Sequence, residues 1–60
     1  MNIYQVVFDD PGEKETKEIV QYVGGSTLER VAEAMSRRAV EMECELRMVR
    51  WWCAVSEVAE

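Results

Sequence analysis

The amino-acid sequence predicts an α+β fold of the order β-β-α-β, a three-stranded antiparallel sheet with one amphipathic helix packed on one face. Two segments rich in β-branched and aromatic residues are separated by a short loop, which is typical of a hairpin. A segment with helical spacing of apolar residues follows, and a third segment then alternates apolar and polar residues. We expect residues 1–60 to form a single small domain.

The predicted hairpin joins a strand at residues 3–8 to a strand at residues 16–23. Both segments are rich in the valine, isoleucine and aromatic residues that strands favour. The turn is predicted at residues 9–12, because Pro11 presets the backbone of the first central position and Gly12 tolerates a positive φ at the second. Two strands joined by so short a loop pair in antiparallel fashion.

The helix is predicted at residues 27–42. Ser26 and Glu29 match a capping box, in which the serine hydroxyl accepts a hydrogen bond from the first turn and the carboxylate accepts one from the serine N–H. The apolar residues that follow recur at helical spacing and form one stripe, which would face the sheet. This stripe contains Leu28, Val31, Ala32, Met35, Ala39 and Met42.

No glycine or proline separates the predicted helix from residues 44–55, so two architectures remain open. In the favoured one, the helix ends near Glu41 and residues 44–55 form the third strand, with apolar residues at alternate positions from Cys44 to Met48. In the alternative, the hairpin is followed by one long coiled-coil helix over residues 27–55, because the apolar residues keep a 4-3 spacing throughout. The strand is favoured, since an isolated hairpin is marginal in water and needs a third strand.

Charge narrows the classes of partner. Twelve acidic and seven basic residues give a net charge of −5. This balance disfavours direct binding to nucleic acid or to an anionic membrane, which needs a basic surface, and it suits a host protein with a basic surface. The sequence has no apolar run of membrane-spanning length and no signal peptide. We therefore expect a cytoplasmic protein, located in the host cytoplasm if a phage encodes it.

Residue types that carry catalytic or metal chemistry are scarce. There is no histidine, and Cys44 and Cys53 lie nine residues apart, which places them on opposite faces of a strand. They can neither form an intrachain disulfide nor complete a zinc site, and neither has a histidine to act as its general base. We predict no catalytic residue, no metal, no cofactor and no enzymatic activity.

Trp51 and Trp52 are the residues best suited to a binding role. Neighbouring side chains of a strand point to opposite faces, so one indole would pack beneath the helix and the other would lie on the bare face of the sheet. Tryptophan, tyrosine and arginine are enriched among the residues that dominate protein interfaces, which adds Tyr22 and Arg50 to the candidates.

Acidic residues of the hairpin loop form a second group of candidates. Asp9, Asp10 and Glu13 would make a charged prong for a partner rich in arginine or lysine. A chain of this length is marginally stable alone, so we also expect a homodimer, with the bare sheet face as one possible contact.

The order of the elements resembles a loose class of small phage-encoded β-β-α-β proteins. The resemblance rests on the hairpin, the helix entry Gly-Gly-Ser-Thr-Leu-Glu at residues 24–29, the amphipathic helix, Val-Arg-Trp-Trp at residues 49–52, and the acidic Ser-Glu-Val at residues 56–58. Several phage anti-defence inhibitors, anti-CRISPR proteins among them, are similar in size, acidity and lack of catalytic motifs. The resemblance implies a non-enzymatic protein that binds a host component and blocks it.

Two functional hypotheses follow. The favoured one is a protein-interaction module, an inhibitor from a phage or mobile element that binds a host defence protein and blocks it sterically. The alternative is an acidic DNA mimic, or another accessory protein related to nucleic acids, in which carboxylates of the hairpin loop and helix replace some phosphates. The salt dependence of binding separates them, because replacement of phosphates makes affinity fall steeply with added salt.

Overall fold

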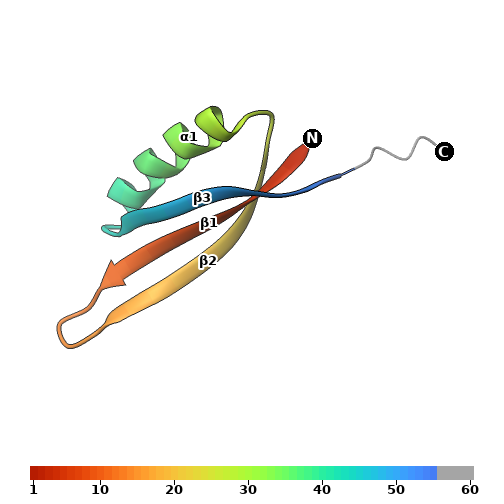
Figure 1. Ribbon diagram of the computed structural model, residues 1–60. Coiled ribbons are helices and arrows are strands. Elements are labelled where there is room, and N and C mark those ends of the chain that lie inside the picture. Colours follow the sequence, from red (N-terminus) through yellow and green to blue (C-terminus); the bar gives the residue numbers. More distant parts are fainter. Residues whose placement is uncertain (56–60) are drawn as a thin grey trace.

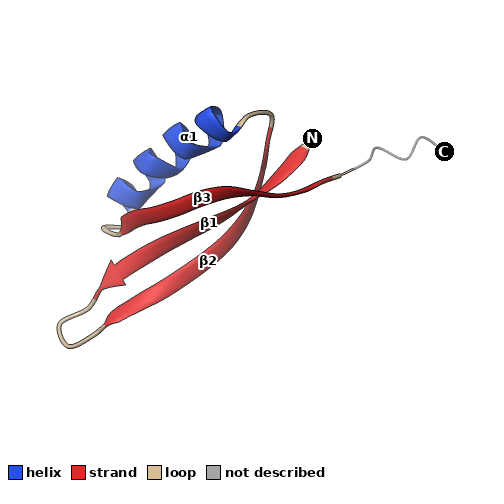
Figure 2. Ribbon diagram, in the orientation of Figure 1, coloured by secondary structure: helices blue, strands red, loops and turns tan. Residues whose placement is uncertain are grey.

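The computed structural model describes residues 1–55 and arranges them as three strands and one helix in the order β-β-α-β (Figure 1). The sheet is antiparallel with the strand order β2-β1-β3, so that β1 is central and the other two strands are its edges (Figure 2). This arrangement confirms the predicted α+β fold. The elements are β1 (Asn2–Pro11), β2 (Thr16–Gly25), α1 (Leu28–Glu41) and β3 (Glu45–Ala54).

β1 and β2 form a hairpin whose ten-residue strands pair without interruption. The chain reverses at residues 12–15, where the N–H of Gly12 donates to the carbonyl of Glu15 at 3.1 Å. The turn predicted at residues 9–12 is therefore wrong, because β1 continues through Pro11 and no glycine has a positive φ in the described part of the chain. Pro11 is tolerated because β1 pairs there with β2 alone, so that the missing N–H interrupts no ladder on the other side.

The N-terminus of α1 is capped by Thr27. Its backbone is extended, and its hydroxyl Oγ1 accepts a hydrogen bond from the N–H of Arg30 at 3.2 Å. The predicted cap, Ser26, is wrong by one residue. The position three residues after the true cap holds Arg30, so Glu29 does not complete a capping box.

The C-terminus of α1 decides between the two architectures. Glu43 takes the left-handed conformation with a φ of 56°. Its N–H donates to the carbonyl of Val40 at 3.2 Å, and the N–H of Cys44 donates to the carbonyl of Ala39 at 2.8 Å. These two bonds form a Schellman motif, which ends the helix and turns the chain into β3. The coiled-coil helix over residues 27–55 is therefore wrong.

β3 runs antiparallel to β1, but its register shifts twice. At the first shift Leu46 opposes Phe8 and Met48 opposes Val7, so Arg47 is an extra residue. Leu46 consequently packs on the helix side of the sheet, whereas Met48 lies beside Val7 on the other side. The regular alternation that the sequence analysis assumed in this segment is wrong, because a bulge changes the face of every residue beyond it.

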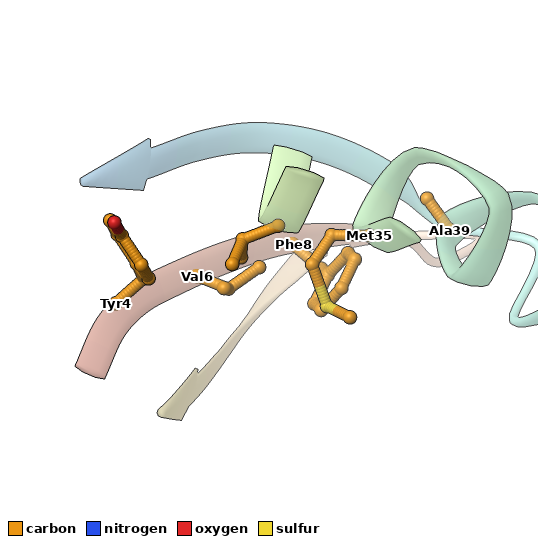
Figure 3. Packing of buried hydrophobic residues seen from close by; sticks show 6 residues of the cluster. Tyr4, Val6, Phe8, Met35 and Ala39 are labelled. Carbon is orange, nitrogen blue, oxygen red and sulfur yellow. The ribbon is translucent and has the colours of Figure 1, made fainter. Parts of the chain in front are cut away.

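The hydrophobic core lies between α1 and one face of the sheet (Figure 3). Alternate residues of β1 point toward the helix, and residues of the predicted helical stripe point back toward β1. Phe8 and Val6 are fully buried, which makes the central strand the main contributor of apolar surface. The buried cluster consists of Tyr4, Val6, Phe8, Val31, Met35 and Ala39.

Candidate interaction surface

The side of the sheet turned away from α1, which we call the open face, is left uncovered by the elements that residues 1–55 form. Its central residue is Val7, which opposes Val20 of β2 and Met48 of β3. Val7 is only 4% exposed, although both of its neighbours are exposed. The neighbours therefore shield the centre while they remain accessible themselves, and the middle of the open face is apolar.

Four side chains beside this centre form a connected group, which we call the open-face cluster: Gln5, Tyr22, Arg50 and Trp52. Nε of Arg50 donates to Oε1 of Gln5 at 2.6 Å, and Nε2 of Gln5 donates to Oη of Tyr22 at 3.2 Å. The rings of Tyr22 and Trp52 meet edge to face, with centroids 5.2 Å apart. The guanidinium carbon of Arg50 lies 5.7 Å from the centre of the Trp52 ring. All three strands contribute to the cluster.

These contacts hold exposed anchors in place. Tyr22 is 54% exposed and Trp52 is 47% exposed, so half of each ring is free for contact. An edge-to-face pair contributes about 0.5–1.5 kcal/mol, and an exposed cation–π contact contributes about 0.5–1 kcal/mol. Side chains that are already ordered lose less conformational entropy when a partner binds. The cluster is thus a preorganised amphipathic patch.

Trp52 lies on the open face, next to Trp51 in the sequence and at the second register shift of β3. Cys53 opposes Ile3 and Trp51 opposes Tyr4, so that Trp52 is the extra residue of the bulge. A bulge bends its strand and redirects a side chain. Here it aims an indole across β1 toward β2.

Trp51 has a different environment from its neighbour. It opposes the buried Tyr4 and therefore lies on the helix side of β3, yet it is 57% exposed. The prediction that one indole packs beneath the helix is wrong, because Tyr4 of the central strand takes that place. Both indoles are accessible, on opposite sides of the same strand.

Ionic contacts tie the three strands together at the hairpin end of the open face. Nε of Arg47 donates to Oδ2 of Asp9 at 2.8 Å, and its Nη1 donates to Oε2 of Glu18 at 3.1 Å. Nη2 of Arg47 also lies 2.5 Å from Oδ1 of Asp9 as an ionic contact. The hydrogen bond to Asp9 and its charge raise the pKa of Arg47 above its ordinary value. The arginine is half exposed, so solvent screens the network and it contributes little to stability.

The structure separates the three acidic residues that the sequence analysis grouped in the loop. Asp9 belongs to β1 and pairs on the open face, whereas Glu13 lies in the exposed loop. Asp10 lies beside Cys44, whose Sγ donates to the carbonyl of Met42 at 3.4 Å. Partial burial, followed by the negative charge of Asp10, raises the pKa of the Cys44 thiol. Neutral thiols are poor nucleophiles.

Both cysteines are free. Over residues 1–55 the surface has no pocket, and no three metal-ligating side chains come together. In the same range no helix combines the length and hydrophobicity that crossing a membrane requires. No family model, curated protein or solved structure matches this chain.

The structure adds residues to the surface that the sequence analysis did not single out. Met48 reaches the open face only because of the first bulge of β3, which no residue type in the sequence marks. Arg47 lies there because it follows Leu46, which faces the helix. Gln5 connects Arg50 to Tyr22, a role that depends on the register of both strand pairs. Its alternation with the buried residues of β1 makes Gln5 a candidate for the open face from the sequence alone, but not its contacts there.

Proposed function

We propose that this chain is a non-enzymatic protein-interaction module that binds a host protein and blocks it sterically, as a phage or mobile-element inhibitor acting in the host cytoplasm would. The supporting observation is the open-face cluster, in which Tyr22, Arg50 and Trp52 hold one another on an uncovered sheet face. These three residue types are enriched among the few residues that supply most of the binding energy in protein interfaces. An ordered, exposed aromatic patch on so small a chain favours a contact with a protein.

The distribution of charge favours a partner with a basic rim. On the open face Arg47 is engaged by two carboxylates, so the charges there are largely balanced. The chain nevertheless carries a net charge of −5, and acidic residues such as Glu13 and Glu15 are exposed in the adjoining loop. An aromatic centre with an acidic rim matches the usual anatomy of an interface, in which the centre holds the partner and the rim steers it.

The test begins with capture of a partner from a lysate of the native host by the tagged chain, followed by binding measurements with the purified partner. Trp52→Ala and Tyr22→Ala each remove an anchor of the open-face cluster. We expect each to weaken binding by about 30-fold or more, which corresponds to about 2 kcal/mol. Val40→Ala is the matched control, because Val40 is 78% exposed on α1 and its loss should leave affinity unchanged.

Trp51→Ala provides a second control, since Trp51 is an equally exposed indole on the other side of β3. If the two cluster variants bind like the wild type while Trp51→Ala fails to bind, the open face is not the binding surface. Binding that ignores both indoles and falls steeply with added salt would instead favour the DNA-mimic hypothesis.

A further inference from the structure

We propose that the outer edge of β2 pairs with β2 of a second copy of this chain, which joins two three-stranded sheets into one continuous six-stranded sheet. Pairing of the strands does not depend on the proposed function. Only the suggestion that a partner binds the enlarged open face of the dimer rests on it. The pairing itself follows from the geometry of the edge strand and from its sequence. It also differs from a dimer that buries the open face, because the edge contact leaves both open-face clusters accessible.

The two edges of the sheet are not equivalent. β3 is interrupted by two bulges, and Figure 1 shows α1 running beside it. β2 lies at the opposite margin and keeps a regular register over all ten residues of Thr16–Gly25, with no proline. A bulge, or a helix packed beside the edge strand, hinders pairing with another strand, whereas a long regular edge strand can pair readily. In residues 1–55, β2 pairs with β1 alone, so its outward N–H and C=O groups are available.

The sequence of β2 is self-complementary in one register. A twofold axis perpendicular to the sheet pairs two identical strands antiparallel, with directly opposite residues on the same face. With Gln21 at the axis, Val20 opposes Tyr22 of the second copy on the open face, and Ile19 opposes Val23 of the second copy on the helix side. Apolar residues therefore meet apolar residues, and two amides meet at the axis. The charged residues Lys17 and Glu18 fall opposite Gly25 and Gly24.

The neighbouring register is less favourable. With Val20 at the axis, Glu18 would oppose Tyr22 of the second copy, and Lys17 would oppose Val23 of the second copy. Each of these pairs sets a charge against an apolar side chain. Gln21 is therefore favoured over Val20 as the residue at the axis.

The contact is long and narrow. Nine paired residues span about 30 Å and form about eight to ten backbone hydrogen bonds. An edge contact of this kind buries less than about 1,000 Å². We therefore expect a weak, concentration-dependent dimer, in which hydrogen bonds and cross-strand side-chain pairs contribute more than buried area does.

The dimer would present two open faces on one side of a single sheet. Tyr22 of each copy lies near the axis, opposite Val20 of the other copy, so the two open-face clusters flank a shared apolar strip. A symmetric partner could then engage both clusters, which raises the overall affinity without any new type of contact. Pairing would also remove the exposed edge that favours aggregation.

Sedimentation equilibrium of the full chain, from about 10 µM to about 1 mM, tests the pairing over the range of weak dimers. The wild type should pass from monomer to dimer. Gln21→Lys and Gln21→Glu each set like charges against each other at the axis, and each should weaken the dimer about five- to tenfold. An equal mixture of the two variants should regain the dimer as a heterodimer. As a control, Ser36→Lys and Ser36→Glu on the exposed surface of α1 should leave dimerisation unchanged.

A cross-link provides a test that does not depend on the strength of the dimer. In a background of Cys44→Ser and Cys53→Ser, Gln21→Cys sets two thiols opposite each other, with Cα atoms about 4.5–5.5 Å apart, within disulfide range. Mild oxidation should give a covalent dimer, whereas Ser36→Cys in the same background should not. A wild type that stays monomeric at 1 mM, together with no cross-link, would overturn the pairing.

These experiments distinguish failure of the β2 pairing from failure of the proposed function. A dimer that is abolished by Trp52→Ala and unaffected by the Gln21 variants would show that the open face is the contact between copies, and the β2 pairing would be wrong. A monomeric chain that still requires Trp52 to bind a host protein would remove the pairing and leave the proposed function standing. The Gln21 variants should retain binding to a single partner molecule.

Discussion

The two faces of the sheet come from the same three strands, yet they differ in burial. On the helix side Tyr4, Val6 and Phe8 are buried, whereas on the open face Val7 is buried between neighbours that remain exposed. The difference arises because α1 covers one face and no second layer covers the other in residues 1–55. The alternation of side chains in β1 thus divides the residues of this strand between the two faces. The even-numbered residues 4, 6 and 8 form the buried core with α1, and the odd-numbered ones lie on the open face.

The sharpest test of this division compares Phe8→Ala with Val7→Ala. Phe8 is fully buried against the helix, so its truncation should cost about 3–5 kcal/mol, which is comparable to the whole contribution of a hydrophobic core in a chain this short. Val7→Ala should cost about 1–2 kcal/mol and leave the fold intact. Urea unfolding followed by circular dichroism measures both. Equal losses would mean that the open face is as essential to folding as the helix side.

A smaller effect separates two adjacent glycines on the two faces. A Cβ at Gly25 would collide with Cγ2 of Val31 in the first turn of α1, and the packed valine cannot move without shifting the helix. We expect Gly25→Ala to cost about 1–3 kcal/mol. A Cβ at Gly24 would lie 2.6 Å from Sδ of Met1, the far end of a flexible side chain. Gly24→Ala should cost less than about 0.5 kcal/mol, since the methionine can change rotamer.

If thermal unfolding shows the same loss of stability for both alanine variants, the contact between Gly25 and Val31 does not limit the size of the residue at position 25 more than the contact with Met1 limits position 24. A large loss for Gly24→Ala alone would reverse the comparison, and would mean that Met1 is a fixed part of the open face.

The faces of β1 could be predicted from its sequence, but those of β3 could not. In β1 a run without bulges keeps a period of two, so that alternation alone places Tyr4 and Phe8 on one side. In β3 the bulges at Arg47 and Trp52 each insert one residue and move the rest to the other face. Neither position carries a glycine or another residue type that marks a bulge, so the assignment needs the tertiary pairing.

The end of the helix illustrates the same limit. The helix stops in a Schellman motif whose left-handed position is normally glycine, but here it is Glu43. A positive φ at a non-glycine residue costs free energy. This cost is offset because the turn lets β3 pair with β1 and lets Cys44 pack against the core. Sequence alone therefore left the strand and the long helix as alternatives. The candidate surface followed the same pattern, because Trp52 and Tyr22 were identifiable by residue type, but their contact depends on the register in which β2 and β3 pair with β1.

The smallest effect concerns the two cysteines, which lie on different sides of the sheet. Cys44 packs against the helix-side core, whereas Cys53 opposes Ile3 on the open face. Burial and the charge of Asp10 raise the pKa of the Cys44 thiol above its ordinary value of 9.0. At pH 8 Cys44 should therefore react with iodoacetamide more slowly in the folded chain than in urea. Asp10→Asn should accelerate the reaction by less than about tenfold, because it removes only one of the causes.

The same shift predicts how stability changes with pH. Because the folded thiol holds its proton more tightly than the unfolded one, its contribution to stability is complete below the unfolded pKa of about 8.5–9 and is lost as pH rises through the folded pKa. Urea midpoints should consequently fall above about pH 9, and the fall should be shallower in Cys44→Ala than in Cys53→Ala. Identical slopes in the two variants would show that ionisation of the Cys44 thiol does not contribute to the loss of stability at high pH.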